Sequence, residues 1–517
     1  MGSDKSQFLD PSIVCVTASQ NTIANKRAET IQALAKESLD LLVIGGGIVG
    51  AGIARDSAMR GLRVGLVEQH DFAFGTSSRS SRLLHGGLRY LAQGQLKLVR
   101  EASLEKRILH RIAPHLAEPL PFIFPTYQGT QWPLWQLRIG VKLYDLLCNG
   151  KNLGKSSSFS RKELLAQVPN LNPSGLTGGV RYFDGLTNDA RLVIDTLRSA
   201  KKHGALLVNY FQFKTAVRDS DQWVCELQDL QSNQTQRLRA RAIINATGPW
   251  SEQVPHSRVK LRLTKGIHIV FESTRLPVPE AIALTQQRRL LFVIPWGERV
   301  IVGTTDTDYC GLLDDVRANP DEIEYLLRAV NELFPALSLT KGDIVSTWAG
   351  LRPLIVEPGK QSRGTVEAPS DVPRSHQIRN PEPGWWDLAG GKLTTYRLMA
   401  EQAIDQVVRW LNKIELLNNS RGSCRTGEEM ILPPSETKGI SGIVPPKFER
   451  EIITHFCSNE WAVHLDDLMI RRTSWHYYFR YTQARAEQVA DWMADVLGWT
   501  QEKRTAELTR YDQLRGV

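Results

Sequence analysis

The chain has 517 residues, 42% of them hydrophobic and 23% charged, and its formal net charge at pH 7 is +9. This length and composition are typical of a globular protein with two or three domains, each burying its own core. No run of roughly 18 apolar residues occurs, which argues against a membrane-spanning helix. The excess of basic residues suits an anionic partner, such as a phosphorylated substrate, an anionic membrane surface or nucleic acid.

The six cysteines lie far apart, and no two of them form a CxxC pair. This spacing argues against a metal site, a dithiol centre and a dense disulfide framework, and it favours a reducing compartment. We therefore expect no bound metal.

Residues 1–37 are polar and lack the apolar core of a secretory signal. We interpret them as a loosely ordered extension ending in a short helix over AETIQALAKES. An organelle transit peptide is the alternative, since Lys26 and Arg27 are present, although acidic residues are present too.

The stretch LLVIGGGIVGAGIARDSAMRGLRVGLVEQ, residues 41–69, has the layout of a strand, a tight turn, a helix and a second strand. Gly45 permits the turn, Gly47 lets the backbone approach a pyrophosphate, and Gly50 lets the helix pack on its strand. Glu68 closes the second strand, where an acidic side chain accepts hydrogen bonds from an adenosine ribose. The pattern predicts a dinucleotide site and disfavours NADP, while FAD and NAD both remain.

The next segment favours FAD. Residues 75–94 place five small hydroxyl residues beside Arg79 and Arg82 and then a glycine pair after His85. Small side chains and paired glycines allow the backbone to lie against a flat ring system or a phosphate. A serine-rich solvated loop is the alternative interpretation of this segment taken alone.

Two later segments end strands in close-approach turns. The strand in RAIINATGPW runs into Ala246, Thr247 and Gly248, and ligands of open α/β sheets bind at such strand ends. In DLAGGKLTTYRLMAEQAIDQVV, a glycine turn precedes a helix whose first turn holds Thr394 and Thr395. That helix amino terminus is suited to negative charge on a reduced flavin.

Seven motifs together resemble those of the FAD-dependent glycerol-3-phosphate dehydrogenases, in the order GGGIVGAGIARDSAMRG, TSSRSSRLLHGGLRYL, DGLTNDARLV, NATGPW, FVIPWGERVIVGTTDTDY, GLRPL and GGKLTTYR. The resemblance spans roughly residues 38–410, with a weaker echo in RRTSWHYY. It implies an α/β fold with a Rossmann-type, glutathione-reductase-like FAD-binding domain, an α+β antiparallel-sheet substrate domain and a carboxyl-terminal helical cap. We expect the FAD-binding domain at 38–111, 180–255 and 355–425, the substrate domain at 112–179 and 256–354, and the helical domain at 426–517.

The resemblance also implies oxidation of sn-glycerol 3-phosphate to dihydroxyacetone phosphate, with hydride transfer from C2 to N5 of FAD and onward transfer of electrons to a membrane quinone. It places the protein in the cytoplasm, peripherally on the inner face of the cytoplasmic membrane, or on an organellar membrane if the source is a eukaryote. A homodimer is left open.

This chemistry needs cations for the phosphate and a base for the hydroxyl proton. Arg89, in HGGLRYL, and Arg352, in GLRPL, lie in matched motifs, and arginine binds phosphate through two parallel hydrogen bonds. Arg374 aligns loosely with a third arginine of the family, and Arg363 is its alternative because the intervening spacing departs from the family. Tyr90 joins the expected substrate contacts.

For the base, His85 is the first candidate, because the unperturbed pKa of histidine lies near working pH and two glycines follow it. His268, in TKGIHIVF, competes with it, although the alternation around His268 suits a core position equally well. Lys265 and Lys392 are candidates for contacting the substrate or a reduced flavin. The expected cofactor contacts are Gly45, Gly47, Ile48, Gly50, Glu68, Thr76, Ser77, Ser78, Leu83, His85, Gly86, Gly87, Leu88, Ala246, Thr247, Gly248, Gly391, Lys392, Leu393 and Thr394.

Residues 131–148, QWPLWQLRIGVKLYDLLC, form an expected amphipathic helix. Basic residues with tryptophans suit a membrane interface, whereas periodicity alone fits burial against the substrate domain equally well. The quinone implied by the family favours peripheral contact with an anionic membrane.

Three alternatives stay open. The same scaffold serves amine oxidases of the glycine or sarcosine type, which HGGLRYL and GLRPL argue against. A glycerol-3-phosphate oxidase that uses O2 is closer, but such oxidases often carry an insertion between the segments matching GLRPL and GGKLTTYR, and here that interval is compact. A non-catalytic FAD-containing scaffold is the third. The aromatic cluster at 475–479 does not predict nucleic-acid binding, because no nucleic-acid fold surrounds it.

Overall fold

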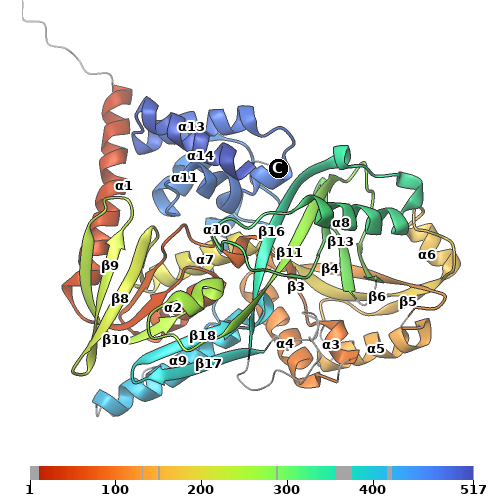
Figure 1. Ribbon diagram of the computed structural model, residues 1–517, viewed down its shortest axis with the longest axis horizontal. Coiled ribbons are helices and arrows are strands. Elements are labelled where there is room, and N and C mark those ends of the chain that lie inside the picture. Colours follow the sequence, from red (N-terminus) through yellow and green to blue (C-terminus); the bar gives the residue numbers. More distant parts are fainter. Residues whose placement is uncertain are drawn as a thin grey trace, which may run out of the picture.

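The computed structural model describes residues 11–92, 94–130, 132–148, 152–286, 289–356, 375–415 and 422–515. Two large sheets lie side by side, and a group of helices from the carboxyl-terminal part covers one end of the first (Figure 1). This arrangement confirms the expected fold class: a Rossmann-type domain, a mainly antiparallel domain and a helical cap.

The first sheet has the order β17-β18-β10-β1-β2-β7. Its parallel strands are β18 (Trp385–Gly390), β10 (Thr235–Asn245), β1 (Leu39–Ile44), β2 (Val64–Val67) and β7 (Leu206–Val208). β17 (His376–Glu382) pairs antiparallel at one edge, and β9 (Gln222–Asp229) with β8 (Phe211–Asp219) extends β10.

Alternation along β1 explains why both faces of this sheet are covered. Leu41 and Val43 pack with helices α2 (Ile48–Met59), α7 (Asp189–Lys202) and α9 (Tyr396–Glu415). Leu42 and Ile44 point the other way, toward the apolar side chains of β8, β9 and β10. Successive strand residues face opposite sides, so a continuous apolar run fits a sheet that is buried on both.

The second sheet has the order β15-β11-β14-β13-β12-β4-β6-β3, with β16 added to β11 and β5 added to β6. Its strands are β3 (Leu83–Leu84), β4 (Glu118–Tyr127), β5 (Ser157–Ser160), β6 (Leu176–Leu186), β11 (Leu261–Glu272), β12 (Ala281–Gln286), β13 (Arg289–Trp296), β14 (Arg299–Gly303), β15 (Thr307–Asp308) and β16 (Ile344–Ile355). Helix α8 (Pro320–Leu333) packs on one face. On the other side lie α3 (Leu88–Ala92), α4 (Leu96–Ile112) and α5 (Leu134–Leu147) (Figure 1). The short α6 (Arg161–Gln167) contacts β5 and β6.

The amino-terminal helix is longer than the sequence predicts. Instead of a short helix after a loose extension, α1 runs over Pro11–Lys36. Long-range contacts hold it: Arg27 donates to Asp229 at 2.7 Å, and Leu34 is buried in the core between the first sheet and α1. Such contacts stabilise a helix beyond its intrinsic propensity.

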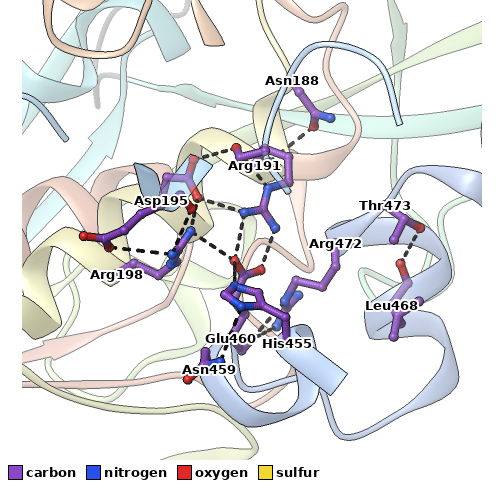
Figure 2. A network of polar contacts seen from close by, with 12 residues as sticks. Asn188, Arg191, Asp195, Arg198, His455, Asn459, Glu460, Leu468, Arg472 and Thr473 are labelled. Carbon is purple, nitrogen blue, oxygen red and sulfur yellow. Dashed lines mark hydrogen bonds and ion pairs between the residues drawn. The ribbon is translucent and has the colours of Figure 1, made fainter. Parts of the chain in front are cut away.

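The carboxyl-terminal helices are α10 (Pro434–Thr437), α11 (Arg450–Asn459), α12 (Trp475–Tyr478), α13 (Gln483–Leu497) and α14 (Gln501–Arg515), with a π-helical turn at Asp467–Arg472. Figure 2 shows the ion network that joins them to α7: Arg191 contacts Glu460 at 2.6 Å and Asp195 at 2.8 Å. Burial alone would raise the pKa of Glu460, but Arg191 and a hydrogen bond from His455 outweigh it and hold this pKa well below its usual range. Buried charges are tolerated only when paired in this way.

The structure moves the expected domain boundaries. β6 crosses the expected boundary at residue 180 and stays in the second sheet until Leu186. β3 belongs to the second sheet although it falls within the expected range 38–111. Ile431 and Leu432 pack in the core of the first domain, so the helical domain begins after the expected residue 426.

Candidate active site

Two adjoining cavities lie between the first and second sheets. The first has a volume of about 410 Å³ and the second of about 260 Å³. Among the residues that the structure describes, six line both: Thr76, Ser80, Pro353, Gly391, Lys392 and Leu393. A ligand in the first cavity is therefore within reach of a ligand in the second.

The first cavity is built around the glycine turn between β1 and α2. Gly45 has φ +108°, which glycine adopts without steric cost. A Cβ on Gly50 would lie 1.9 Å from the carbonyl oxygen of Gly45, so only glycine fits there. Helix α2 begins at Ile48 directly after the turn, and its amino terminus can take a phosphate.

Glu68 follows β2 and lines the same cavity. Its carboxylate accepts hydrogen bonds from the backbone N–H groups of Gly46, at 2.7 Å, and His70, at 2.8 Å. Burial raises the pKa of Glu68, opposed by His70 and these two bonds. The side chain is therefore fixed at the strand end, where a ribose hydroxyl is expected.

Two further turns complete the first cavity. Ala246, Thr247 and Gly248 follow β10, and Gly391, Lys392 and Leu393 follow β18. Leu393–Thr395 form a single 3-10 turn that leads into α9. The strand-end position, the glycine turns and the ribose-facing carboxylate fit FAD, whose ring system would be reached from the shared wall.

The second cavity carries positive charge. Arg352, on β16, lines it and is only about one-fifth exposed. Its guanidinium donates to Thr304 Oγ1 at 3.0 Å, to the Thr305 carbonyl at 3.2 Å and to Asp306 at 3.1 Å. Gly266 makes room for it, because a Cβ there would lie 2.3 Å from Arg352 Nη2. The guanidinium of Arg352 is held in one orientation, as recognition of an anion requires.

Both candidate histidines line the second cavity. The backbone N–H of His85 donates to Thr394 Oγ1 at 3.0 Å, and the residue is partly exposed. His268 is buried, stacks on Trp348 with ring centroids 5.0 Å apart, and has Nε2 2.8 Å from Ser81 Oγ. Burial, with Arg352 and Arg82 nearby, lowers the pKa of His268 to about 3.

The two candidate lysines lie apart. Lys392 lines both cavities, with Nζ 3.8 Å from the ring centroid of Tyr90, which also lines the second cavity. Lys265 lines neither cavity. Its Nζ pairs with Glu322 of α8 at 2.8 Å, on the other face of β11 from His268. The structure therefore places Lys265 outside both cavities, with its ammonium on Glu322.

The remaining expected contacts divide between the cavities. Gly45, Gly47, Ile48, Glu68, Thr76, Ser77 and Ala246–Gly248 line the first, whereas Leu83, His85, Gly87 and Leu88 line the second. Gly50, Ser78, Gly86 and Thr394 line neither; Gly50 and Thr394 instead support residues that do. The side chain of Arg89, and all of Arg363 and Arg374, lie outside the described residues, so their expected roles stay predictions.

Several lining residues have no assigned role in the motifs quoted above. Asp189 is fully buried against the first cavity and accepts a hydrogen bond from the Ser80 backbone at 2.9 Å. Arg79 lines the second cavity and lies 5.4 Å over the ring of Phe74. Asp184 and Asp306 also line the second cavity. These residues belong to quoted motifs, so the motifs indicated the right segments without indicating each residue's place.

Comparison with known proteins decides the family. The model of the FAD dependent oxidoreductases matches residues 40–391, and that of the C-terminal domain of alpha-glycerophosphate oxidase matches residues 444–504. An aerobic glycerol-3-phosphate dehydrogenase of Staphylococcus aureus (strain USA300) is 38% identical over 397 residues, covering 75% of this chain and 70% of that one. The chain belongs to the FAD-dependent oxidoreductases.

Solved structures of FAD-dependent oxidoreductases support the same family assignment. A glycerol-3-phosphate dehydrogenase from Bacillus halodurans, complexed with FAD, is 27% identical with a TM-score of 0.72, covering 95% of this chain and 97% of that one. An L-alpha-glycerophosphate oxidase from Mycoplasma pneumoniae, also with FAD bound, shares the fold at 18% identity and a TM-score of 0.58, covering 77% and 99%. The family resemblance and the FAD cofactor predicted from the sequence are thereby confirmed.

Proposed function

We propose that this FAD-dependent oxidoreductase oxidises sn-glycerol 3-phosphate to dihydroxyacetone phosphate. The observation that carries the proposal is that Arg352 and Lys392 line the second cavity, which adjoins the FAD cavity at Gly391, Lys392 and Leu393. The substrate's secondary alcohol loses a hydride from C2 and a proton from its hydroxyl. Bound FAD supplies the two-electron acceptor for that chemistry.

Residues of the second cavity suit these needs. Arg352 and Lys392 offer cations for the phosphate, and Tyr90 offers a hydroxyl. His85 is proposed to take the hydroxyl proton, because it is partly exposed in the cavity. Both ring nitrogens of His268 are covered: Ser81 meets Nε2, and Nδ1 is enclosed without a hydrogen-bond partner among the described residues.

An anaerobic titration tests the substrate. The purified yellow protein is mixed with glycerol 3-phosphate, and the visible flavin band is followed. Bleaching supports the proposal. A flavin that stays oxidised while dithionite still reduces it would refute the substrate, and bleaching by sarcosine instead would favour an amine oxidase.

We further propose that the electrons pass to a membrane quinone and that α5 contacts the membrane from the cytoplasmic side. Trp135, Ile139, Leu143 and Leu146 recur at helical spacing on α5 and are 60, 61, 37 and 68% exposed. Arg138 and Lys142, both exposed, lie beside this stripe on the helix. An apolar stripe flanked by basic residues suits an interface with anionic lipid.

The inner face of α5 packs on the protein through Leu137, Val141 and Tyr144. The two interpretations of residues 131–148 are therefore compatible, because each describes one face of the helix. Among the described residues, no helix has the length and apolarity to cross a bilayer. Contact through a surface helix needs no such span.

Vesicle co-sedimentation tests this surface. Trp135→Ser combined with Ile139→Ser should weaken binding to vesicles that contain anionic lipid by about tenfold or more. Leu312→Ser, at a residue that is 77% exposed in another part of the protein, is the matched control. Equal binding of both variants would refute the assignment of α5.

Oxygen is the second candidate acceptor, because the carboxyl-terminal match is to a domain named for alpha-glycerophosphate oxidase. Stoichiometric peroxide formation in air at the full turnover rate would favour O2. Turnover that requires a soluble quinone analogue would favour the membrane acceptor.

A further inference from the structure

The loop at His85–Gly87 is held from two sides. On one side, Thr394 Oγ1 bonds both the N–H, at 3.0 Å, and the carbonyl, at 3.3 Å, of His85. On the other side, the N–H of Gly86 donates to the hydroxyl of Tyr144, at 2.9 Å, and more distantly to Asp184 Oδ1, at 3.3 Å. Tyr144 comes from the inner face of α5 and lines neither cavity.

Tyr144 belongs to a buried polar group that reaches the second cavity only through Asp184. Its hydroxyl donates to Asp184 Oδ1 at 2.6 Å, and Lys106 of α4 pairs with the same oxygen at 2.8 Å. The side chains of Tyr144 and Lys106 are fully buried. The lysine cation offsets the cost of burying the Asp184 carboxylate, so this group can persist in a dry environment.

The hydrogen bonds define the role of the phenol. Burial, with Asp184 nearby, raises the pKa of Tyr144 well above its usual value. The hydroxyl therefore stays protonated. It donates a hydrogen bond to Asp184 and accepts one from the N–H of Gly86. The fit around the loop is also tight, because a Cβ on Gly86 would lie 2.3 Å from the Tyr144 hydroxyl and 2.6 Å from Ser103 Oγ.

We propose that Tyr144 is a positioning residue for the oxidation: through the amide of Gly86 it fixes the loop that presents His85 to the second cavity. The proposal rests on the proposed function, since the position of His85 matters for turnover only if it takes the substrate proton. Displacing a proton acceptor by a fraction of an ångström slows the chemical step more than it weakens binding.

Tyr144→Phe tests this in the FAD-loaded full chain. It keeps the ring and removes only the hydroxyl. In anaerobic stopped flow, we expect the limiting rate of flavin reduction by glycerol 3-phosphate to fall about tenfold, with the substrate Kd within about twofold. The isotope effect with substrate deuterated at C2 should grow or stay unchanged, and FAD content should not change.

Gly86→Ala provides a second test, because the added methyl group collides with the same hydroxyl. The matched control is Tyr127→Phe: the Tyr127 hydroxyl is buried and has no hydrogen-bond partner among the described residues, so its loss should leave the rate unchanged. Thermal unfolding of each variant separates a folding defect from a slower reaction.

Wild-type reduction rates in both Tyr144→Phe and Gly86→Ala would overturn the proposal. So would a rate loss in Tyr144→Phe that is matched by loss of FAD or by an equal rise in Kd, because the hydroxyl would then serve folding or binding. If glycerol 3-phosphate fails to reduce even the wild-type flavin, the proposed function fails, and that result is distinct from either of these.

Discussion

The two cavities are built in opposite ways. The first depends on glycines, which have no side chain: Gly45 lets the backbone turn, and Gly50 lets α2 approach that turn. The second depends on long side chains held by neighbours, such as Arg352 by Thr304 and Asp306. This difference teaches that adding atoms should damage the first cavity and removing atoms should damage the second. Cofactor binding and substrate binding should therefore fail separately.

The largest expected effect on cofactor binding comes from Gly50→Ala. The new Cβ would meet the Gly45 carbonyl at 1.9 Å, so the turn must move away from the position that FAD requires. Overpacking of this kind costs about 1–3 kcal/mol, which corresponds to FAD binding that is about five to 150 times weaker. Most of the protein should purify colourless and inactive. Gly422→Ala is the control, because no other part of the described chain comes within 4 Å of a Cβ added there. A fully yellow Gly50→Ala protein would contradict the close approach.

Arg352→Ala should have the opposite effect: the protein should still bind FAD but lose affinity for the substrate. Removing a fixed guanidinium from a phosphate site costs several kcal/mol, so kcat/KM should fall about 1000-fold, mainly through KM. Steady-state kinetics measure this, and the visible spectrum reports the FAD. Arg262→Ala provides the comparison, since Arg262 pairs with Asp308 at 2.6 Å and lines neither cavity. An unchanged KM in Arg352→Ala would remove it from the phosphate site.

His85→Gln should lower kcat about 100-fold while changing KM little, because a proton acceptor acts in the transition state. His268→Gln is the competing variant. Full turnover by His85→Gln, together with a large loss in His268→Gln, would transfer the base to His268.

Glu68→Ala tests the side chain of the first cavity that is expected to bind the ribose. Losing its hydrogen bonds to Gly46 and His70, and to a ribose, should weaken FAD by about tenfold. Fluorescence titration of the apoprotein with FAD measures this. Glu101→Ala, on the surface of α4, serves as the reference, and equal affinity in the two variants would leave Glu68 without a cofactor role.

The smallest expected effect is on the pH profile of His268→Gln. With a pKa of about 3, His268 is neutral in the folded protein between pH 5 and 8. In the unfolded chain, histidine has a pKa near 6.5 and becomes protonated as the pH falls below that value. The contribution of the neutral, buried imidazole to stability is therefore complete above about pH 6.5 and is lost as the pH falls toward 3. The acid limb of kcat/KM should therefore stay in place in His268→Gln. A limb that moves would show that His268 titrates during turnover.

The contrast between the cavities also explains what could be predicted from the sequence. The first cavity could be predicted from short motifs, because a glycine turn between strand and helix is a local feature. The predicted residues Gly45, Gly47, Glu68 and Thr247 all line it. The second is assembled from strands far apart in the chain, so Arg352 was found through its motif while its partner Asp306 was not. Arg79 and Asp189 had no local signal that distinguished them from solvated residues.

The position of Lys265 follows from strand geometry. Residues three apart on a strand face opposite sides, so Lys265 and His268 cannot both line one cavity on β11. His268 and Val270 face one side, and Ile267 and Ile269 face α8. The length of α1 could not be found in this way, because contacts such as Arg27 with Asp229 span about two hundred residues.

The order in which the first cavity is assembled has a consequence for synthesis of the protein. Its lining begins at Ile44 and ends at Leu393, drawing on β1, β10 and β18. A chain still emerging from the ribosome lacks the wall around Gly391 until 393 of the 517 residues exist. FAD therefore finds its complete binding surface only late in translation, and until then the apolar ends of the parallel strands have no cofactor to cover them.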